Sequence, residues 1–247
     1  MVIKFLNADY YHTKVKSKLV IDFLKSIRVG ESILDMGAGE MPFKKYCEHL
    51  NYTSQDFCQY EGKGDGRGLQ TDKFDVKGID IVCDIKQIPV PDERYDNILC
   101  SEVLEHIENP LEGIKEMRRI LKPGGKVIIT VPGTSLLHFS PYHYYTGFKD
   151  NFFNLLLGKS GFDIDRITRV GTIYSVTALY LWYIADKFSK VIFPWRSSLF
   201  FKMFILGFSP FISLFLILDY IRILDTRTIE AGLLVIATKR HENSHGT

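Results

Sequence analysis

The sequence has almost no net charge, few cysteines and no uninterrupted apolar stretch of about 20 residues, the length that a straight membrane-spanning helix needs. Its 31 basic and 29 acidic residues leave a net charge of +2. We therefore expect no nucleic-acid partner, because no global field attracts one. The four cysteines show no metal-ligand spacing and suit a reducing compartment. Lys4 and Asp9 precede any long apolar run, so we expect no secretory signal.

The most informative segment is Ile33–Glu40, with the sequence ILDMGAGE. Its apolar residues predict a short buried strand over Ser32–Met36, followed by a Gly-x-Gly turn. Phe43, Tyr46 and Cys47 follow at helical spacing, so we expect a helix after the turn. A strand, a glycine-rich turn and a helix together bring backbone N–H groups close to a bound ligand.

The residues of the turn indicate which ligand it binds. A dinucleotide fingerprint needs a third glycine, and this chain has Pro42 there. Asp35 ends the strand just before the first glycine, and its carboxylate suits a cationic amino group better than a pyrophosphate. The segment therefore favours S-adenosylmethionine over NAD, with an ordinary tight turn as the alternative.

Apolar segments alternate with helical ones along the chain. The second expected strand, 51–56, ends in Asp56 about 20 residues after the turn, where an acid meets ribose hydroxyls in nucleotide-binding folds. A helix is expected over 111–121. Further strands are expected over 79–83, 95–100, 126–131, 162–168 and 231–238. This order predicts an α/β fold with a Rossmann-like, doubly wound sheet of seven strands.

The chain resembles class I S-adenosylmethionine-dependent methyltransferases of the type-11 group, because four motifs of that family occur here in the same order. They are ILDMGAG, the acid of SQDF, CDIKQIPVPDERYDNILCSEVLEHI and RRILKPGGKVIITVP. The resemblance covers roughly residues 31–169. SQDFCQYEGKGDG and SLLHFSPYHYYTGF are similar to bacterial members found in surface-polysaccharide biosynthesis. The resemblance implies an enzyme, its fold and its cofactor, S-adenosylmethionine.

The resemblance also implies a set of cofactor-binding residues. Asp35 and the backbone of the turn would hold the methionyl end, Asp56 the ribose, and Asp84 and Ile85 the adenine. Ser101 would lie where the methyl group points. The full implied set is Asp35, Gly37, Ala38, Gly39, Asp56, Asp84, Ile85 and Ser101.

The acceptor side has three interpretations. Glu102, Glu105 and His106 share one short turn, and His138 and His143 follow the fifth strand. His106 or His143 could act as a general base beside Glu102. A divalent cation could instead bind Glu102, Glu105, His106 and either later histidine, because the motif is similar to ubiquinone-pathway and small-RNA 2′-O-methyltransferases. The third interpretation is a simple helix start, with His106 in a capping role.

Two apolar runs, Val170–Ala185 and Met203–Leu218, interrupt the fold before its last strand. Gly207–Pro210 breaks the second run, and basic residues lie among large aromatics such as Trp195 between the runs. We expect a membrane-associated helical hairpin, with a dimer interface or core-packing helices as the alternative. The expected domains are 1–169 with 229–240 for methyl transfer, 170–228 for the apolar insertion, and 241–247 as a flexible tail.

The sequence therefore predicts an O-methyltransferase on the cytoplasmic face of the membrane, peripheral or monotopic. Its acceptor would be a membrane- or lipid-linked hydroxyl, on a glycan or on a lipid such as a quinone. Aromatic residues after the fifth strand could stack on that acceptor: Phe139, Tyr142, Tyr144, Tyr145 and Phe148. The alternatives are a soluble sugar or small-molecule methyltransferase that forms a homodimer through the insertion, and a membrane-docked binding protein without catalysis.

Overall fold

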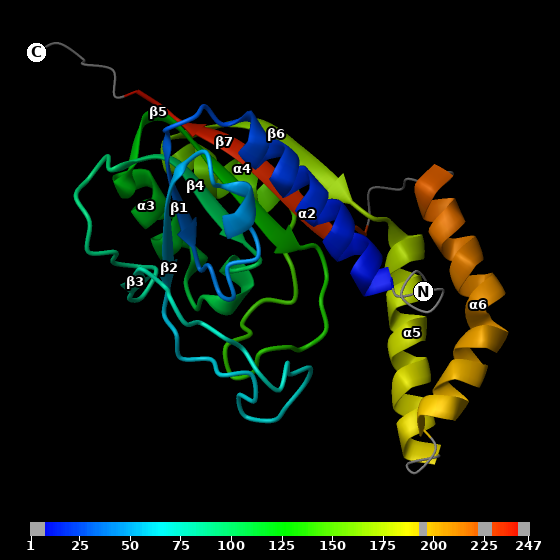
Figure 1. Ribbon diagram of the computed structural model, residues 1–247. Coiled ribbons are helices and arrows are strands. Elements are labelled where there is room, and N and C mark those ends of the chain that lie inside the picture. The colour runs from blue at the N-terminus through cyan, green and yellow to red at the C-terminus, as the bar shows by residue number, and fades with distance from the viewer. Residues whose placement is uncertain (1–7, 193–196, 222–228, 242–247) are drawn as a thin grey trace, which may run out of the picture. The chain divides into compact units, whose positions relative to one another are not determined.

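The computed structural model describes residues 8–192, 197–221 and 229–241. Seven strands form one sheet in the order β3-β2-β1-β4-β5-β7-β6 (Figure 1). The strands are β1 (Ser32–Met36), β2 (Asn51–Asp56), β3 (Ile81–Val82), β4 (Tyr95–Ser101), β5 (Leu121–Pro132), β6 (Phe162–Val170) and β7 (Gly232–Lys239). The predicted seven-stranded, Rossmann-like α/β fold is confirmed.

Alternate residues of the central strands enter two separate cores. Leu34 of β1 packs with the helices α3 (Pro110–Ile120) and α4 (Asp150–Lys159), whereas its neighbour Ile33 packs with α2 (Ala8–Ser26). This alternation follows from the two-residue period of a strand. Both faces are covered, so the central strands β1, β4, β5 and β7 contain apolar runs in the sequence.

The parallel register brings the carboxyl ends of β1, β2 and β4 to one edge of the sheet. Asp35 of β1 pairs with Ser54 of β2 on one side and with Leu99 of β4 on the other. β1 and β4 are neighbours, but the chain continues from β1 to β2 on one side and from β4 to β5 on the other. The crevice between these two connections is the kind of switch point at which α/β proteins bind ligands.

The expected helix after the glycine turn is wrong. Only one 3-10 turn, η1 (Lys44–Tyr46), forms between β1 and β2. Met41 adopts a left-handed backbone conformation with φ of 53°, and Asn51 already starts the next strand, so too few residues remain for an α-helix. Phe43 and Cys47 are nevertheless buried, against the α2 side of the sheet.

The last two strands run antiparallel. The N–H of Arg240 donates to the carbonyl of Gly161, and the N–H of Ala231 donates to the carbonyl of Val170. Residue numbers therefore rise along β7 as they fall along β6, which identifies a hairpin. The segment between Val170 and Ala231 replaces the short loop that usually joins such strands.

The chain consists of two compact units. The described parts of 1–17 and 169–232 form one, and 18–168 with the described part of 233–247 forms the other. In the first unit, α5 (Ile173–Ile192) packs on α6 (Ser197–Ile221) around the buried side chains of Ala178 and Ile212 (Figure 1). The domain limits expected from the sequence stay a prediction.

Polar contacts close the base of the α5–α6 hairpin. The carboxylate of Asp219 accepts hydrogen bonds from the N–H and the hydroxyl of Thr172, at 2.6 and 2.7 Å, and all three groups are buried. These contacts tie the end of α6 to the start of α5. Trp195 and the rest of 193–196 lie outside the described residues, as do 242–247 of the expected tail. Among the helices that the structure describes, none combines the length and the apolar character that a membrane crossing requires.

We predict that a two-residue Asn-Gly turn in place of 171–230 leaves the sheet folded. Val170 and Ala231 already form the closing pair of a hairpin, and the insertion has its own apolar cluster. Far-UV circular dichroism and thermal unfolding of the shortened chain would check this. One cooperative transition is expected, and loss of that transition would show that the sheet needs the insertion.

Candidate functional site

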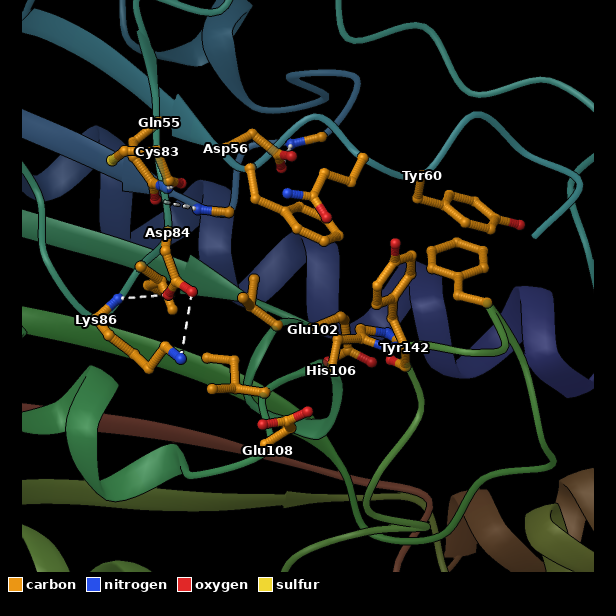
Figure 2. Close-up of a pocket in the computed structure, with 18 of the residues that line it drawn as sticks. Gln55, Asp56, Tyr60, Cys83, Asp84, Lys86, Glu102, His106, Glu108 and Tyr142 are labelled. Atoms are coloured by element: carbon orange, nitrogen blue, oxygen red, sulfur yellow. Dashed lines mark hydrogen bonds and ion pairs between the residues drawn. The ribbon is translucent and has the colours of Figure 1, made fainter. Parts of the chain in front are cut away.

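A cavity of about 460 Å³ opens at the carboxyl edge of the sheet, within the range of small-molecule sites. It is lined from the turn after β1, the end of β2, the segment after β3, and η2 (Leu104–His106) after β4. In the view of Figure 2, Asp84 and Lys86 lie at one end and Tyr60 at the other, with His106 and Tyr142 between them. All of these residues belong to the unit built on residues 18–168.

The glycine turn forms one wall of the cavity. Gly37 has a φ of 75°, and a side chain there would lie 2.5 Å from a methyl group of Val103. A side chain at Gly39 would lie 2.8 Å from the ring of Phe74. The turn therefore needs glycine at both positions, because Val103 and Phe74 occupy the space that a side chain would take, and its backbone lines the cavity.

Asp56 is fixed at the end of β2 by backbone donors. One carboxylate oxygen accepts from the N–H of Gly39 at 2.9 Å, and the other accepts from the N–H of Cys58 at 2.8 Å. Each carboxylate oxygen can accept two hydrogen bonds, so both keep capacity for ligand hydroxyls. Asp56 lines the cavity.

Asp84 and Ile85 follow β3 at the far end of the cavity. The Asp84 carboxylate accepts a hydrogen bond from the backbone N–H of Lys86 at 2.9 Å. It also lies 3.3 Å from the Lys86 ammonium (Figure 2). This contact holds the carboxylate without burying it, since the Asp84 side chain is 59% exposed. Ile85, in contrast, is buried and presents an apolar surface.

Asp35 lies behind the turn rather than in the cavity wall. Its carboxylate is buried and accepts a hydrogen bond from the Tyr52 hydroxyl at 2.7 Å. Burial raises the pKa of Asp35 to about 7, partly offset by the Tyr52 hydrogen bond, and the nearby Asp56 raises it further. The structure thus surrounds this acid with little that stabilises its charge.

Glu102 is the first residue after β4 and adopts a left-handed backbone conformation with φ of 56°. This conformation is costly for a residue with a side chain and is often found at functional sites. The Glu102 N–H donates to the Thr130 carbonyl, and the side chain lines the cavity. Ser101 instead bonds the Thr130 hydroxyl at 2.9 Å and lies outside the cavity lining.

Three histidines gather beside the cavity. The ring centroids of His106 and His138 are 4.8 Å apart, and those of His138 and His143 are 4.4 Å apart. Burial and the neighbouring His138 lower the pKa of His106 to about 3, so its ring is neutral at pH 7. Burial also lowers the pKa of His143, which contacts Ser135 and is absent from the lining.

Aromatic rings line part of the cavity, and we call this set the aromatic wall: Phe57, Tyr60, Phe74, Phe139 and Tyr142. Tyr60 and Phe139 stack with centroids 4.5 Å apart, and Phe57 meets Tyr142 edge-on at 5.1 Å. Such a surface suits a ring or the apolar face of a sugar.

Seven of the predicted site residues line the cavity: Gly37, Gly39, Asp56, Asp84, Ile85, Glu102 and His106. Asp35, Ala38, Ser101 and His143 do not. Of the five aromatics expected to meet an acceptor, Tyr145 and Phe148 pack in the core instead. Phe57, Tyr60 and Phe74 were not predicted, because they reach the cavity through a long loop after β2 that has no periodic pattern.

Comparisons with known proteins agree with this fold and site. Residues 8–179 match the family described as a methyltransferase domain. A solved structure of phosphoethanolamine N-methyltransferase 2 from Haemonchus contortus, in complex with S-adenosyl-L-methionine, superposes with a TM-score of 0.52 and 18% identity. The match covers 92% of this chain and 53% of that one, and at this identity it shows the fold.

Two curated relatives match about half of the chain. "Probable tRNA methyltransferase 9B" of Mus musculus is 29% identical over 132 residues, 51% of this chain and 28% of the relative. A ubiquinone/menaquinone biosynthesis C-methyltransferase of Pseudomonas paraeruginosa is 25% identical over 122 residues, 46% of this chain and 48% of the relative. The chain thus spans about half or less of the length of these relatives.

We predict that Asp35→Asn stabilises the protein without ligand at neutral pH. The folded state holds the Asp35 proton up to about pH 7, whereas the unfolded state loses it near pH 4, so ionisation of Asp35 destabilises the fold as pH rises between these values. The variant should gain on the order of 4 kcal/mol at pH 8 at most, and nothing at pH 3. Denaturant unfolding at both pH values checks this; an equal effect at both would contradict it.

Proposed function

Because the chain belongs to the methyltransferase-domain family and is an S-adenosylmethionine-dependent enzyme, we propose that it methylates a hydroxyl oxygen of a membrane- or lipid-linked acceptor. The observation that carries this proposal is that a single cavity is lined by the expected cofactor-binding residues Asp56 and Asp84, by the carboxylate of Glu102 and by the aromatic wall. The Pseudomonas relative is named for quinone biosynthesis, which supports a lipid acceptor. The resemblance to surface-polysaccharide enzymes supports a lipid-linked glycan.

The residues at the carboxyl edge fit S-adenosylmethionine. Gly37 and Gly39 line the cavity with backbone that the methionyl end could approach closely, and Asp56 keeps accepting capacity for the ribose hydroxyls. Asp84 and Ile85 would hold the adenine at the other end of the cavity. Asp35 would act from behind the turn, where its negative charge favours a cationic ligand once it is ionised.

Glu102 is the proton acceptor in this proposal. Bound S-adenosylmethionine supplies an already activated methyl group, so the protein has to align the acceptor oxygen and take its proton. Glu102 lines the cavity on a backbone that holds it in a strained conformation. His106 is less suited to this task, because a pKa of about 3 makes it a weak base.

The second part of the proposal is that the α5–α6 hairpin docks on a lipid surface. Four apolar or aromatic residues recur at every third position of α6 and are at least half exposed: Phe211, Leu214, Ile217 and Tyr220. The side chain of Ile212 is buried against α5, so α6 is apolar on both its inner and outer sides. A helix of this kind needs an apolar environment beyond its own partner helix.

We predict that Glu102→Gln lowers methyl transfer about 100-fold or more and leaves the affinity for S-adenosylmethionine within threefold. The assay uses S-adenosylmethionine with a labelled methyl group and membranes from the native cells. Label is expected in the lipid extract, in a bond stable to mild alkali, as an ether is. Glu108→Gln is the matched control at the cavity rim. Label found only in water-soluble products would contradict the lipid-linked acceptor, and full activity of Glu102→Gln would contradict its role.

We predict that the double substitution Leu214→Asp and Ile217→Asp weakens binding to phosphatidylglycerol vesicles at least about tenfold, because burial of each side chain contributes roughly 1.5–3 kcal/mol. The control pair, Val29→Asp and Leu155→Asp, changes apolar residues that are 83% and 53% exposed outside the hairpin. Vesicle flotation measures both. Equal binding of the two variants would contradict docking through α6. A dimer that forms without vesicles and is lost in the Leu214→Asp and Ile217→Asp variant would instead favour a homodimer interface through the insertion.

A further inference from the structure

Phe139 is the residue that joins the aromatic wall to His106. It stacks on Tyr60 with ring centroids 4.5 Å apart, and it stacks on His106 with centroids 5.3 Å apart and an angle of 22° between the ring planes. It also meets Phe74 edge-on at 5.5 Å. All four residues line the cavity, so the ring of Phe139 sets the spacing of the others along this part of the lining.

The backbone of Phe139 is strained. Its φ of 50° lies in the left-handed region, which is a rare conformation for a bulky side chain. Such a conformation persists only where the surrounding structure enforces it, and it is common at sites that hold a ligand. Phe139 is half-buried and lines the cavity, so the strain points to a role in ligand binding rather than in core packing alone.

The loop after β2 enforces this conformation. The N–H of Phe139 donates to the Leu69 carbonyl at 3.1 Å. At the next residue, the Ser140 carbonyl accepts from the N–H of Asp65 at 3.0 Å, and the Ser140 hydroxyl donates to the Asp65 carboxylate at 2.9 Å. A side chain at Gly64 would overlap the Ser140 carbonyl, so this close approach of two backbones requires glycine.

The charges in the lining favour an uncharged acceptor group. Lys86 is the one lysine or arginine in the lining that the described residues form, and it lies 3.3 Å from Asp84. In Figure 2 this pair lies at the end of the cavity away from Tyr60, on which Phe139 stacks. A negatively charged group beside Phe139 would therefore be repelled, with the compensating cation at the far end. The acidic residues of the lining are Asp56, Asp84, Glu102 and Glu108.

We propose that Phe139 is a specificity-determining residue that restricts the acceptor to a hydroxyl carried on an uncharged ring. A sugar or phenol-type ring can place a face against an aromatic side chain, whereas an open-chain hydroxyl, such as that of a glycerol headgroup, has no face to stack. Asp65 and Leu69 are positioning residues, because they act through the backbone at Phe139. That the bound ring is methylated rests on the proposed function, but the preference for a ring does not.

Two probes with the same alkyl chain test this preference. Octyl β-glucoside carries its hydroxyls on a ring, and 1-O-octylglycerol carries them on an open chain. Calorimetry measures the binding of each, below its micelle concentration, to the full chain saturated with S-adenosylhomocysteine. We expect the native chain to bind the glucoside about tenfold more tightly. Any binding of the octyl chain to α6 adds equally to both.

Phe139→Ala should remove the difference between the probes and keep the affinity for S-adenosylmethionine within threefold. Phe152→Ala is the matched control, because Phe152 packs against the core and does not line the cavity. Phe139→Gly separates the ring from the strain. Glycine usually destabilises a protein relative to alanine, but at a left-handed position this order reverses. The Phe139→Gly variant should therefore unfold at a higher temperature than Phe139→Ala, while both lose the ring preference.

Equal affinity of the native chain for the two probes, including no binding of either, would overturn the proposal. A ring preference that survives in both Phe139 variants would also overturn it, as would a higher unfolding temperature for Phe139→Ala. Methyl label in the lipid extract without a ring preference would keep the proposed function and reject the role of Phe139. A ring preference that depends on Phe139, with label only in water-soluble products, would keep that role and contradict the lipid-linked acceptor.

Discussion

The turn after β1 depends on hydrogen bonds from its backbone to the end of β2. The N–H groups of Gly37 and Ala38 donate to the Gln55 carbonyl at 2.9 and 2.8 Å, and the N–H of Gly39 donates to the Asp56 carboxylate. A neighbouring strand thus fixes a turn that would otherwise need a helix behind it. This explains why the site forms although only one 3-10 turn follows. It also places Asp56 where its remaining accepting capacity faces the cavity.

The central strands β1, β4 and β5 could be predicted from the sequence because each carries an apolar run that ends next to a glycine or an acid, at Gly37, Glu102 and Gly133. Parallel pairing then brings those ends together without further information. The helix after the turn could not be predicted correctly, because Phe43, Tyr46 and Cys47 have helical spacing for another reason. Phe43 and Cys47 pack against the sheet from an irregular segment. Periodicity reports which residues face the core, and it does not report whether the backbone is helical.

The site was predictable where it depends on strand ends and unpredictable where it depends on loops. Asp56 ends β2, Asp84 comes two residues after β3 and Glu102 follows β4 directly, and all three line the cavity. The choice between His138 and His143 depends on how one loop folds, and spacing gave no basis for it. Asp35 shows a third case. Its position was correct, but burial separates it from the cavity and raises its pKa, which no sequence pattern indicates.

The aromatic wall and the histidine cluster are parts of one construction. Leu69 lies opposite His138 in a parallel bridge, in which the Leu69 N–H donates to the Leu137 carbonyl and the Phe139 N–H donates to the Leu69 carbonyl. Ser140 exchanges two hydrogen bonds with Asp65. The loop after β2, which supplies Tyr60 and Phe74 to the wall, therefore holds the loop that carries His138. Changes in the first loop that alter which acceptor fits would also move the imidazole. The aromatic wall and the imidazole of His138 therefore depend on the same contacts between two loops.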